Sequence, residues 1–141
     1  MNTVFWTIVA GVSVFVLGQI LLKLFIEPIL KLKFFKGIIA DSLVYYADIY
    51  SNPGLNKEED AKKASQEIRK LGSELMAKIT VIPCYRLWSF LRIVPQLDEV
   101  RKAHRSLIGL SNGLFRGDPE RNTKRVENIK NALCLPKELL R

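Results

Sequence analysis

The chain has 141 residues and a net charge of +8, from 22 basic and 14 acidic side chains. This length allows one small domain and an anchor. With one histidine and two cysteines, the chain lacks the ligand cluster that a metal centre needs.

Residues 4–22 contain no charged side chain. As a helix these 19 residues are about 29 Å long, close to the roughly 30 Å hydrocarbon core of a bilayer. The alternatives are a buried helix and a cleaved signal peptide. A buried helix would normally carry a polar stripe, and a signal peptide needs basic residues before the apolar run and a cleavage site after it. We therefore interpret residues 1–26 as an uncleaved transmembrane anchor.

The basic residues that flank the span predict its orientation. Lys23, Lys31, Lys33 and Lys36 follow the apolar run, and no basic residue precedes it. The positive-inside tendency then predicts an outside N-terminus and a cytoplasmic C-terminal domain.

Small residues follow one side of the span. Thr7, Gly11, Val14 and Gly18 recur at helical spacing, and Gln19 lies beside them near the inner end. Such a stripe allows close helix packing and favours a homo-oligomer, with Thr7, Gly11, Gly18 and Gln19 as packing residues. The alternative is that glycine is simply common in membrane helices.

Residues 27–50 are expected to form a juxtamembrane amphipathic helix, kinked or restarted at Pro28. Two placements stay open from the sequence, because such a helix can lie on the membrane surface or enter the cytosolic core.

Residues 51–141 are expected to form a basic helical cytosolic domain, so the whole chain is predicted to be all-α. A turn at residues 51–54 precedes Asn56, which we expect to cap a helix that ends near Ile79. Pro83 and Pro95 are expected to start two further helices, and Asp118 to cap the last one.

Apolar residues at helical spacing predict the core of this domain. We expect Cys84 and Cys134 to be buried, reduced apolar residues on the cytosolic side. The helix after Pro95 carries a predicted core stripe of Leu97, Val100, Ala103, Leu107, Leu110 and Leu114.

No nucleotide-binding glycine motif and no plausible arrangement of nucleophile and base is present, so we expect a non-catalytic protein without a cofactor. His104 is expected to be a partly buried structural residue.

Positive charge is concentrated in residues 83–141, which hold twelve basic and six acidic side chains. Arginines with aromatic neighbours are typical of sites for phosphorylated ligands, nucleotides or lipid headgroups. The alternative is a solvated basic face with Trp88 and Phe90 in the core. The candidate ligand-binding residues are Arg86, Arg92, Arg101, Lys102, Arg105, Arg121 and Arg125.

Several runs resemble a family of small bacterial single-span membrane proteins of uncharacterised function. They are GQILLKLFIEP at 18–28, ADSLVYYADIYSNPG at 40–54, IPCYRLWSFLRIVP at 82–95, LIGLSNGLFRGDPERN at 107–122 and a closing IKNALCL. The resemblance implies a bacterial inner-membrane location and assigns no functional residue.

Three functions remain open. The first is a non-catalytic membrane-anchored binding module, oligomeric through its span, that recognises an anionic partner with its basic cytosolic half. The second is a membrane-perturbing effector or sensor of the bacterial defence type, gated by a nucleotide. The third is a structural subunit that binds a protein partner in a larger membrane complex.

Overall fold

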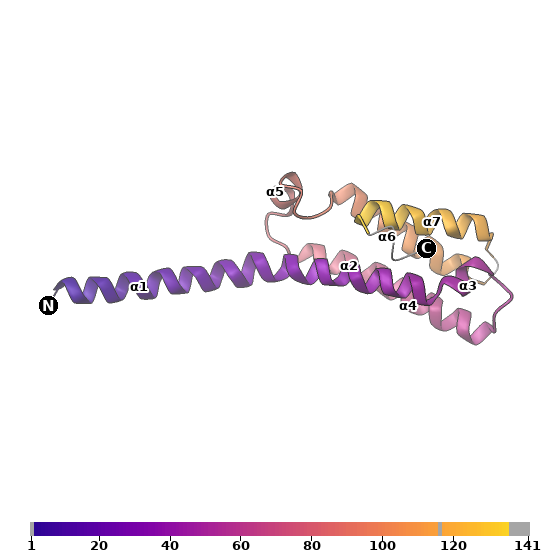
Figure 1. Cartoon of the computed structure of the whole chain (residues 1–141), viewed down its shortest axis with the longest axis horizontal. Helices are drawn as coiled ribbons and strands as arrows, with labels where there is room; N and C mark the ends of the chain where they lie inside the picture. The colour runs from indigo at the N-terminus through magenta and orange to yellow at the C-terminus, as the bar shows by residue number, and fades with distance from the viewer. Residues whose placement is uncertain (1, 116, 136–141) are drawn as a thin grey trace.

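The structure is a computed structural model that describes residues 2–115 and 117–135. These residues form helices and turns without a strand, which confirms the all-α prediction. Figure 1 shows a long N-terminal rod that continues along a helical bundle. The helices are α1 (Asn2–Leu21), the π-helical turn η1 (Leu22–Ile26), α2 (Glu27–Tyr45), α3 (Ala47–Ser51), α4 (Glu58–Thr80), α5 (Tyr85–Phe90), α6 (Leu97–Gly113) and α7 (Pro119–Leu133).

The rod runs without interruption from Asn2 to Tyr45, so of the two predicted outcomes at Pro28, a kink or a restart, the restart does not occur. The helix instead widens just before the proline, where the Glu27 N–H donates to the Leu22 carbonyl. A proline inside a helix removes one backbone bond and crowds the carbonyl four residues back. A π turn relieves this conflict while the chain stays helical.

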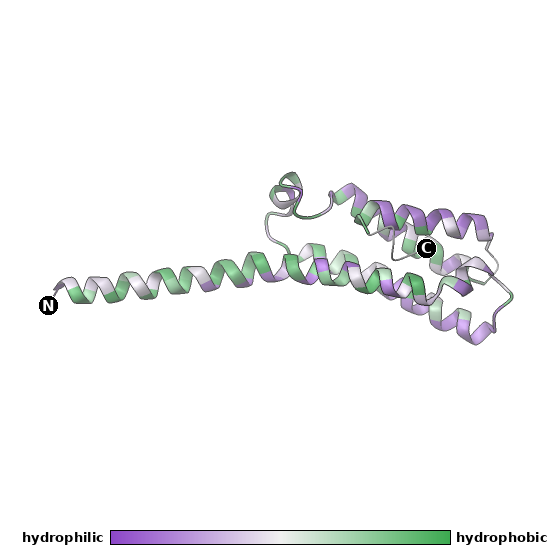
Figure 2. Ribbon diagram, in the orientation of Figure 1, coloured by the Kyte–Doolittle hydropathy of each residue, from purple (hydrophilic) through white to green (hydrophobic). Residues whose placement is uncertain are grey.

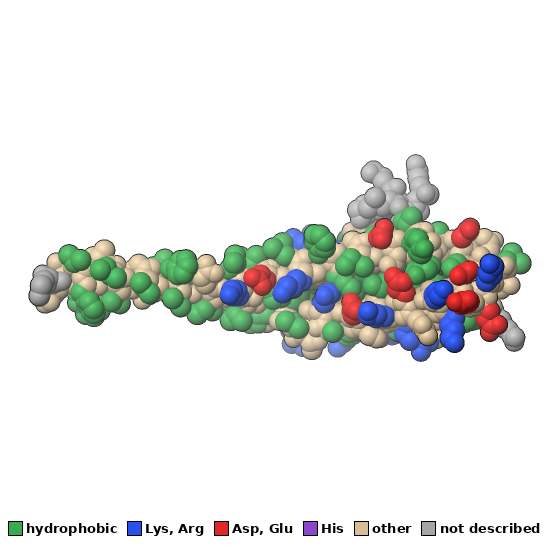
Figure 3. All heavy atoms as spheres, turned by 90° about the horizontal axis from the view of Figure 1, so that it is seen from below, with side chains coloured by type: hydrophobic (Ala, Val, Ile, Leu, Met, Phe, Trp, Pro, Cys, Tyr) green, Lys and Arg blue, Asp and Glu red, His purple; other side chains and the backbone are tan. Residues whose placement is uncertain are grey.

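In Figure 2 the ribbon of α1 is coloured mostly hydrophobic along its length, whereas α7 carries long hydrophilic stretches. No residue of α1 is buried. In the space-filling view, charged side chains are absent along the rod until the region where α2 begins (Figure 3). Among the described residues, the rod is the one helix long and apolar enough to cross a membrane.

The inner face of α2 belongs to the core of the bundle, where it packs against α4. This decides between the two placements that the sequence left open for residues 27–50. A fragment that begins near Asn56 would lack the inner face of α2 and would leave the core of the bundle incomplete. A soluble form of the bundle therefore has to include α2. The buried residues of α2 are Ile29, Leu32, Phe35, Ile39, Ala40, Ser42 and Leu43.

Helix α6 packs on both α4 and α7 and supplies the centre of the core. The predicted core stripe is confirmed, since its members are fully buried except Leu97, which is partly buried. The contact with α4 is close at Gly72, where an added Cβ would lie 3.2 Å from Cδ1 of Ile108.

Of the two predicted helix caps, one is confirmed and the other is wrong. Asp118 caps α7 as expected, because its Oδ1 accepts a hydrogen bond from the Glu120 N–H at 3.0 Å. The prediction for Asn56 is wrong, because α4 begins one residue later and Lys57 occupies the N-cap without a side-chain bond. The Asn56 amide instead donates to the Asn52 carbonyl and closes the preceding turn.

The prediction that both cysteines are buried is also wrong. Cys84 and Cys134 are exposed and have left-handed backbone conformations, with φ of 53° and 52°. Cys134 ends α7, and the next N–H, of Leu135, donates back to the Lys130 carbonyl. This is the Schellman arrangement, in which the residue that reverses the chain lies outside the core.

Candidate anion-binding surface

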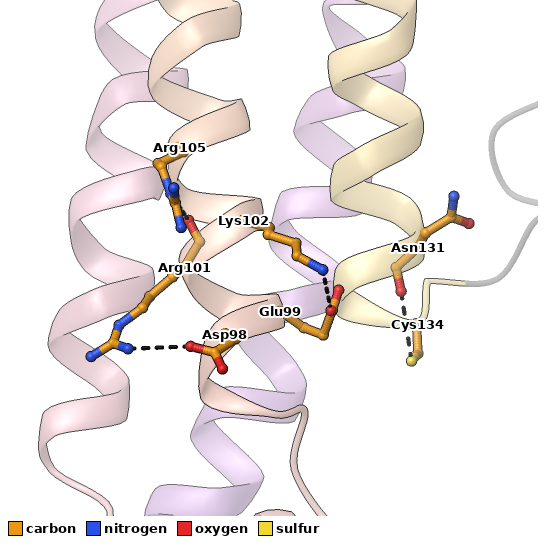
Figure 4. Close-up of polar contacts among 7 residues, drawn as sticks. All are labelled: Asp98, Glu99, Arg101, Lys102, Arg105, Asn131 and Cys134. Atoms are coloured by element: carbon orange, nitrogen blue, oxygen red, sulfur yellow. Dashed lines mark hydrogen bonds and ion pairs between the residues drawn. The ribbon is translucent and has the colours of Figure 1, made fainter.

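Three candidate basic residues lie on the exposed side of α6 (Figure 4). Nη1 of Arg101 lies 3.3 Å from Oδ1 of Asp98, and Nζ of Lys102 lies 2.6 Å from Oε1 of Glu99. Both ion pairs are exposed, so each stabilises the fold by about 0–1 kcal/mol. An anionic ligand can therefore replace these carboxylates at little cost.

A groove of about 530 Å³ lies between α6 and α7 and contains two of these cations. Lys102 and Arg105 supply positive charge, while Asn128 and Asn131 on α7 supply neutral amide donors. This combination of charged and neutral donors suits phosphate oxygens, which accept several hydrogen bonds. The groove is lined by Glu99, Lys102, Arg105, Ser106, Asn128, Asn131 and Ala132.

The Arg105 side chain forms a hydrogen bond with the backbone of its own helix, α6. Its Nε donates to the Arg101 carbonyl at 3.4 Å, which is a long hydrogen bond. The candidate residues Arg101 and Arg105 thus lie together on α6, although only Arg105 lines the groove.

The two candidate residues on α7, Arg121 and Arg125, lie in different surroundings. Arg121 is exposed in a hollow beside Asp118 and Lys124. Arg125 lies against α6, where an added Cβ on Gly109 would come within 2.9 Å of its Nε. The two side chains therefore do not converge on a common ligand.

Arg125 is positioned by a buried amide that the sequence patterns did not single out. Its Nη1 donates to Oδ1 of Asn122 at 3.2 Å, and Asn122 is completely buried. Nδ2 of Asn122 donates in turn to the carbonyls of Gly113 at 3.0 Å and Tyr50 at 3.3 Å. Asparagine in an amphipathic helix is normally a solvent-facing residue, so no sequence signal pointed to this role.

Arg86 and Arg92 belong to a separate region. Arg86 lies in α5 and Arg92 in the turn that follows, and both are exposed. The seven candidate basic residues are thus divided among α6, α7 and the α5 region and do not form one site. Phe90 is 83% exposed, so the alternative that placed it in the core is wrong for this residue. Trp88 is partly buried.

The candidate packing residues of the span are all exposed. A Cβ added to Gly11 or Gly18 would meet no atom within 4 Å. The Thr7 hydroxyl donates to the Thr3 carbonyl at 2.9 Å, so its hydrogen bond is made within the helix and its methyl group stays available for packing.

His104 and Tyr85 each have a structural partner. Nδ1 of His104 lies 2.9 Å from the Gly72 carbonyl, an acceptor, so this nitrogen carries the proton. Burial raises the pKa of Tyr85 to about 12, and its hydroxyl donates to the Pro95 carbonyl at 2.7 Å. Within the described residues, no group of three or more histidine, cysteine, aspartate or glutamate side chains is placed to hold a metal ion.

Comparisons of the chain with family models, with curated proteins and with solved structures found no match. The resemblance to small bacterial single-span membrane proteins therefore stays a prediction from the motifs themselves.

Proposed function

We propose that the chain is a non-catalytic binding module, anchored in the bacterial inner membrane by α1, that recognises an anionic partner with its bundle. The N-terminus lies outside and the bundle in the cytoplasm, in keeping with the lysines that follow the span. The partner is a phosphorylated small molecule, a nucleotide or a lipid headgroup, and self-association through the span would present several copies of the binding surface.

The observation that carries this proposal is the groove between α6 and α7. Lys102 and Arg105 from α6 and Asn128 and Asn131 from α7 line it, so its polar residues come from two packed helices and not from one flexible segment. The core beneath is fully buried at Leu107 and Ile129, which holds the two helices in register. A rigid scaffold under a polar groove reduces the ordering cost of binding.

The test compares two double variants of the full-length protein in mild detergent. Lys102→Ala with Arg105→Ala removes two positive charges from the groove. Arg121→Ala with Lys124→Ala removes the same charge from the exposed face of α7. Binding is measured by titration with oligonucleotides, cyclic nucleotides and anionic vesicles at two salt concentrations.

We expect the groove variant to bind at least one of these ligands several-fold more weakly than the parent, and the α7 variant to resemble the parent. Higher salt should weaken binding in each case, because clustered charges lose most of their attraction to a ligand when it is screened. Equal weakening in both variants would show that net charge is responsible and not the groove. A parent that binds none of the ligands at low salt would contradict the proposal and favour a structural subunit.

A further inference from the structure

Residues 81–93, which make up most of the segment between α4 and α6, are called the α5 loop below. It lies near the end of the apolar part of the rod, and in Figure 1 α5 lies at the end of the bundle from which α1 extends. The Trp88 and Phe25 rings contact each other, with centroids 6.0 Å apart and planes tilted by 56°. The α5 loop is thereby held at a defined position along the rod.

That position corresponds to the headgroup layer of a bilayer. If residues 4–22 cross the hydrocarbon core, Phe25 lies three residues, or about 4.5 Å, beyond its edge. Trp88 then lies at the depth where tryptophan is enriched in membrane proteins. Trp6, near the other end of the apolar run, contacts Phe5 at the opposite interface.

The α5 loop exposes large apolar side chains at this depth. Phe90 is 83% exposed, and Leu87 and Leu91 are about half exposed. The polar aromatic groups of the same loop are satisfied internally, since Nε1 of Trp88 donates to the Pro83 carbonyl at 3.0 Å. The loop is thus folded onto itself and leaves an apolar surface with no protein cover in the described chain.

The charges of the α5 loop complement this surface. The guanidinium groups of Arg86 and Arg92 have no hydrogen-bond or ion-pair partner among the described residues, whereas Arg101 and Lys102 on α6 are each paired with a carboxylate. Arg92 has a φ of 57° at the point where α5 reverses direction, a position that glycine occupies at lower cost. Unpaired arginines next to exposed apolar side chains are typical of segments that lie in a membrane interface.

We propose that the α5 loop binds the interfacial layer of the same bilayer that α1 crosses. Leu87, Phe90 and Leu91 enter the upper acyl-chain region, while Arg86 and Arg92 contact lipid phosphates. This second attachment fixes the rotation and height of the bundle relative to the membrane. The inference rests on the proposed membrane span and is independent of the groove between α6 and α7.

The experiment measures depth with a nitroxide label on full-length protein reconstituted in vesicles of phosphatidylcholine with a minority of phosphatidylglycerol. In a Cys84→Ser, Cys134→Ser background, single labels are attached through Phe90→Cys, Leu55→Cys or Val14→Cys. Leu55 is the matched control, because it is 84% exposed in the turn before α4, at the far end of the bundle. Oxygen concentrates in lipid and a nickel chelate in water, so the ratio of their collision rates reports depth.

We expect this ratio to be several-fold higher at residue 90 than at residue 55 and highest at residue 14. Equal, water-like ratios at residues 90 and 55 would overturn the inference about the α5 loop. A water-like ratio at residue 14 would show instead that the span itself is not in the membrane. Protection of residue 90 from both reagents would mean that protein covers it, for example a second copy, and would also overturn the inference.

A second measurement tests the arginines. Adding phosphatidylglycerol to phosphatidylcholine vesicles should raise the ratio at residue 90 in the parent, because anionic lipid attracts the loop. Arg86→Gln with Arg92→Gln should abolish this rise while leaving residue 14 unchanged. The same rise in both proteins would overturn the assignment of lipid phosphates to these two arginines.

Discussion

Replacing Asn122 tests the interpretation that one buried amide holds three parts of the bundle together. Its Nδ2 bonds to the carbonyls of Tyr50 in α3 and Gly113 at the end of α6, while Oδ1 accepts from Arg125. In Asn122→Ala, both carbonyls lose their side-chain donor in a position that has no exposure to water.

The magnitude follows from these bonds. Two lost hydrogen bonds cost about 1 kcal/mol each, and the Tyr50 carbonyl, left without its side-chain donor, costs roughly 1–3 kcal/mol more. The Gly113 carbonyl still accepts from the Gly117 N–H and adds no such penalty. The bond to Tyr50 is long at 3.3 Å, so we take the lower part of the range and expect a loss of about 3 kcal/mol. Against a total stability of about 5–15 kcal/mol for a typical domain, this is a large fraction.

The assay is urea unfolding of the full-length protein in micelles, followed by Trp88 fluorescence in a Trp6→Phe background. With a slope of about 1.5 kcal/mol per molar urea, the midpoint should fall by about 2 M. The matched control is Asn128→Ala on the exposed side of the same helix, which should be neutral or slightly stabilising because alanine has the higher helix propensity.

An unchanged midpoint in Asn122→Ala would refute this account. Asn122→Asp separates the two halves of the amide, because it keeps the shape and the acceptor for Arg125 but has no N–H donor. We expect it to remain destabilised. If Asn122→Asp were as stable as the parent, the contact with Arg125 and not the two carbonyls would account for the contribution of Asn122.

Two further predictions concern the span and the pH response. Gly11→Ile with Gly18→Ile should lower the oligomer mass in mild detergent by blocking close helix approach, whereas Val12→Ile should not, and an unchanged mass would exclude the small-residue stripe as the assembly surface. Burial, and then the hydrogen bond to Glu67, raises the pKa of Tyr46 to about 12, above the roughly 10 of an unfolded chain. The protonated phenol therefore contributes stability that is complete below about pH 10 and is lost as the pH rises through about 12. In Tyr46→Phe the urea midpoint should depend less on pH over this range than in the parent. The same dependence of the midpoint on pH in both proteins would contradict the assignment.

The features that the sequence determined depend on neighbours along the chain. The uncharged run of residues 4–22 makes a long apolar helix regardless of what surrounds it, because its length and composition are local properties. The cap at Asp118 and the core stripe from Val100 to Leu114 were predictable for the same reason, since a cap depends on residues one turn away and the helical spacing of apolar residues is a local pattern. The sequence identifies the seven candidate basic residues as charged, but it does not show which of them lie near one another in the folded chain.

Tertiary structure decided the features that depend on a partner far along the chain. Asn122 is buried because the Tyr50 carbonyl, 72 residues earlier, needs a donor there. Arg125 is drawn onto α6 because Gly109 leaves room for its guanidinium. Cys84 and Cys134 are exposed because each lies where the chain reverses direction, and hydropathy carries no information about that geometry. Helical periodicity shows which face of a helix is apolar, but only the packed chain decides whether that face meets a membrane or, as in α2, another helix.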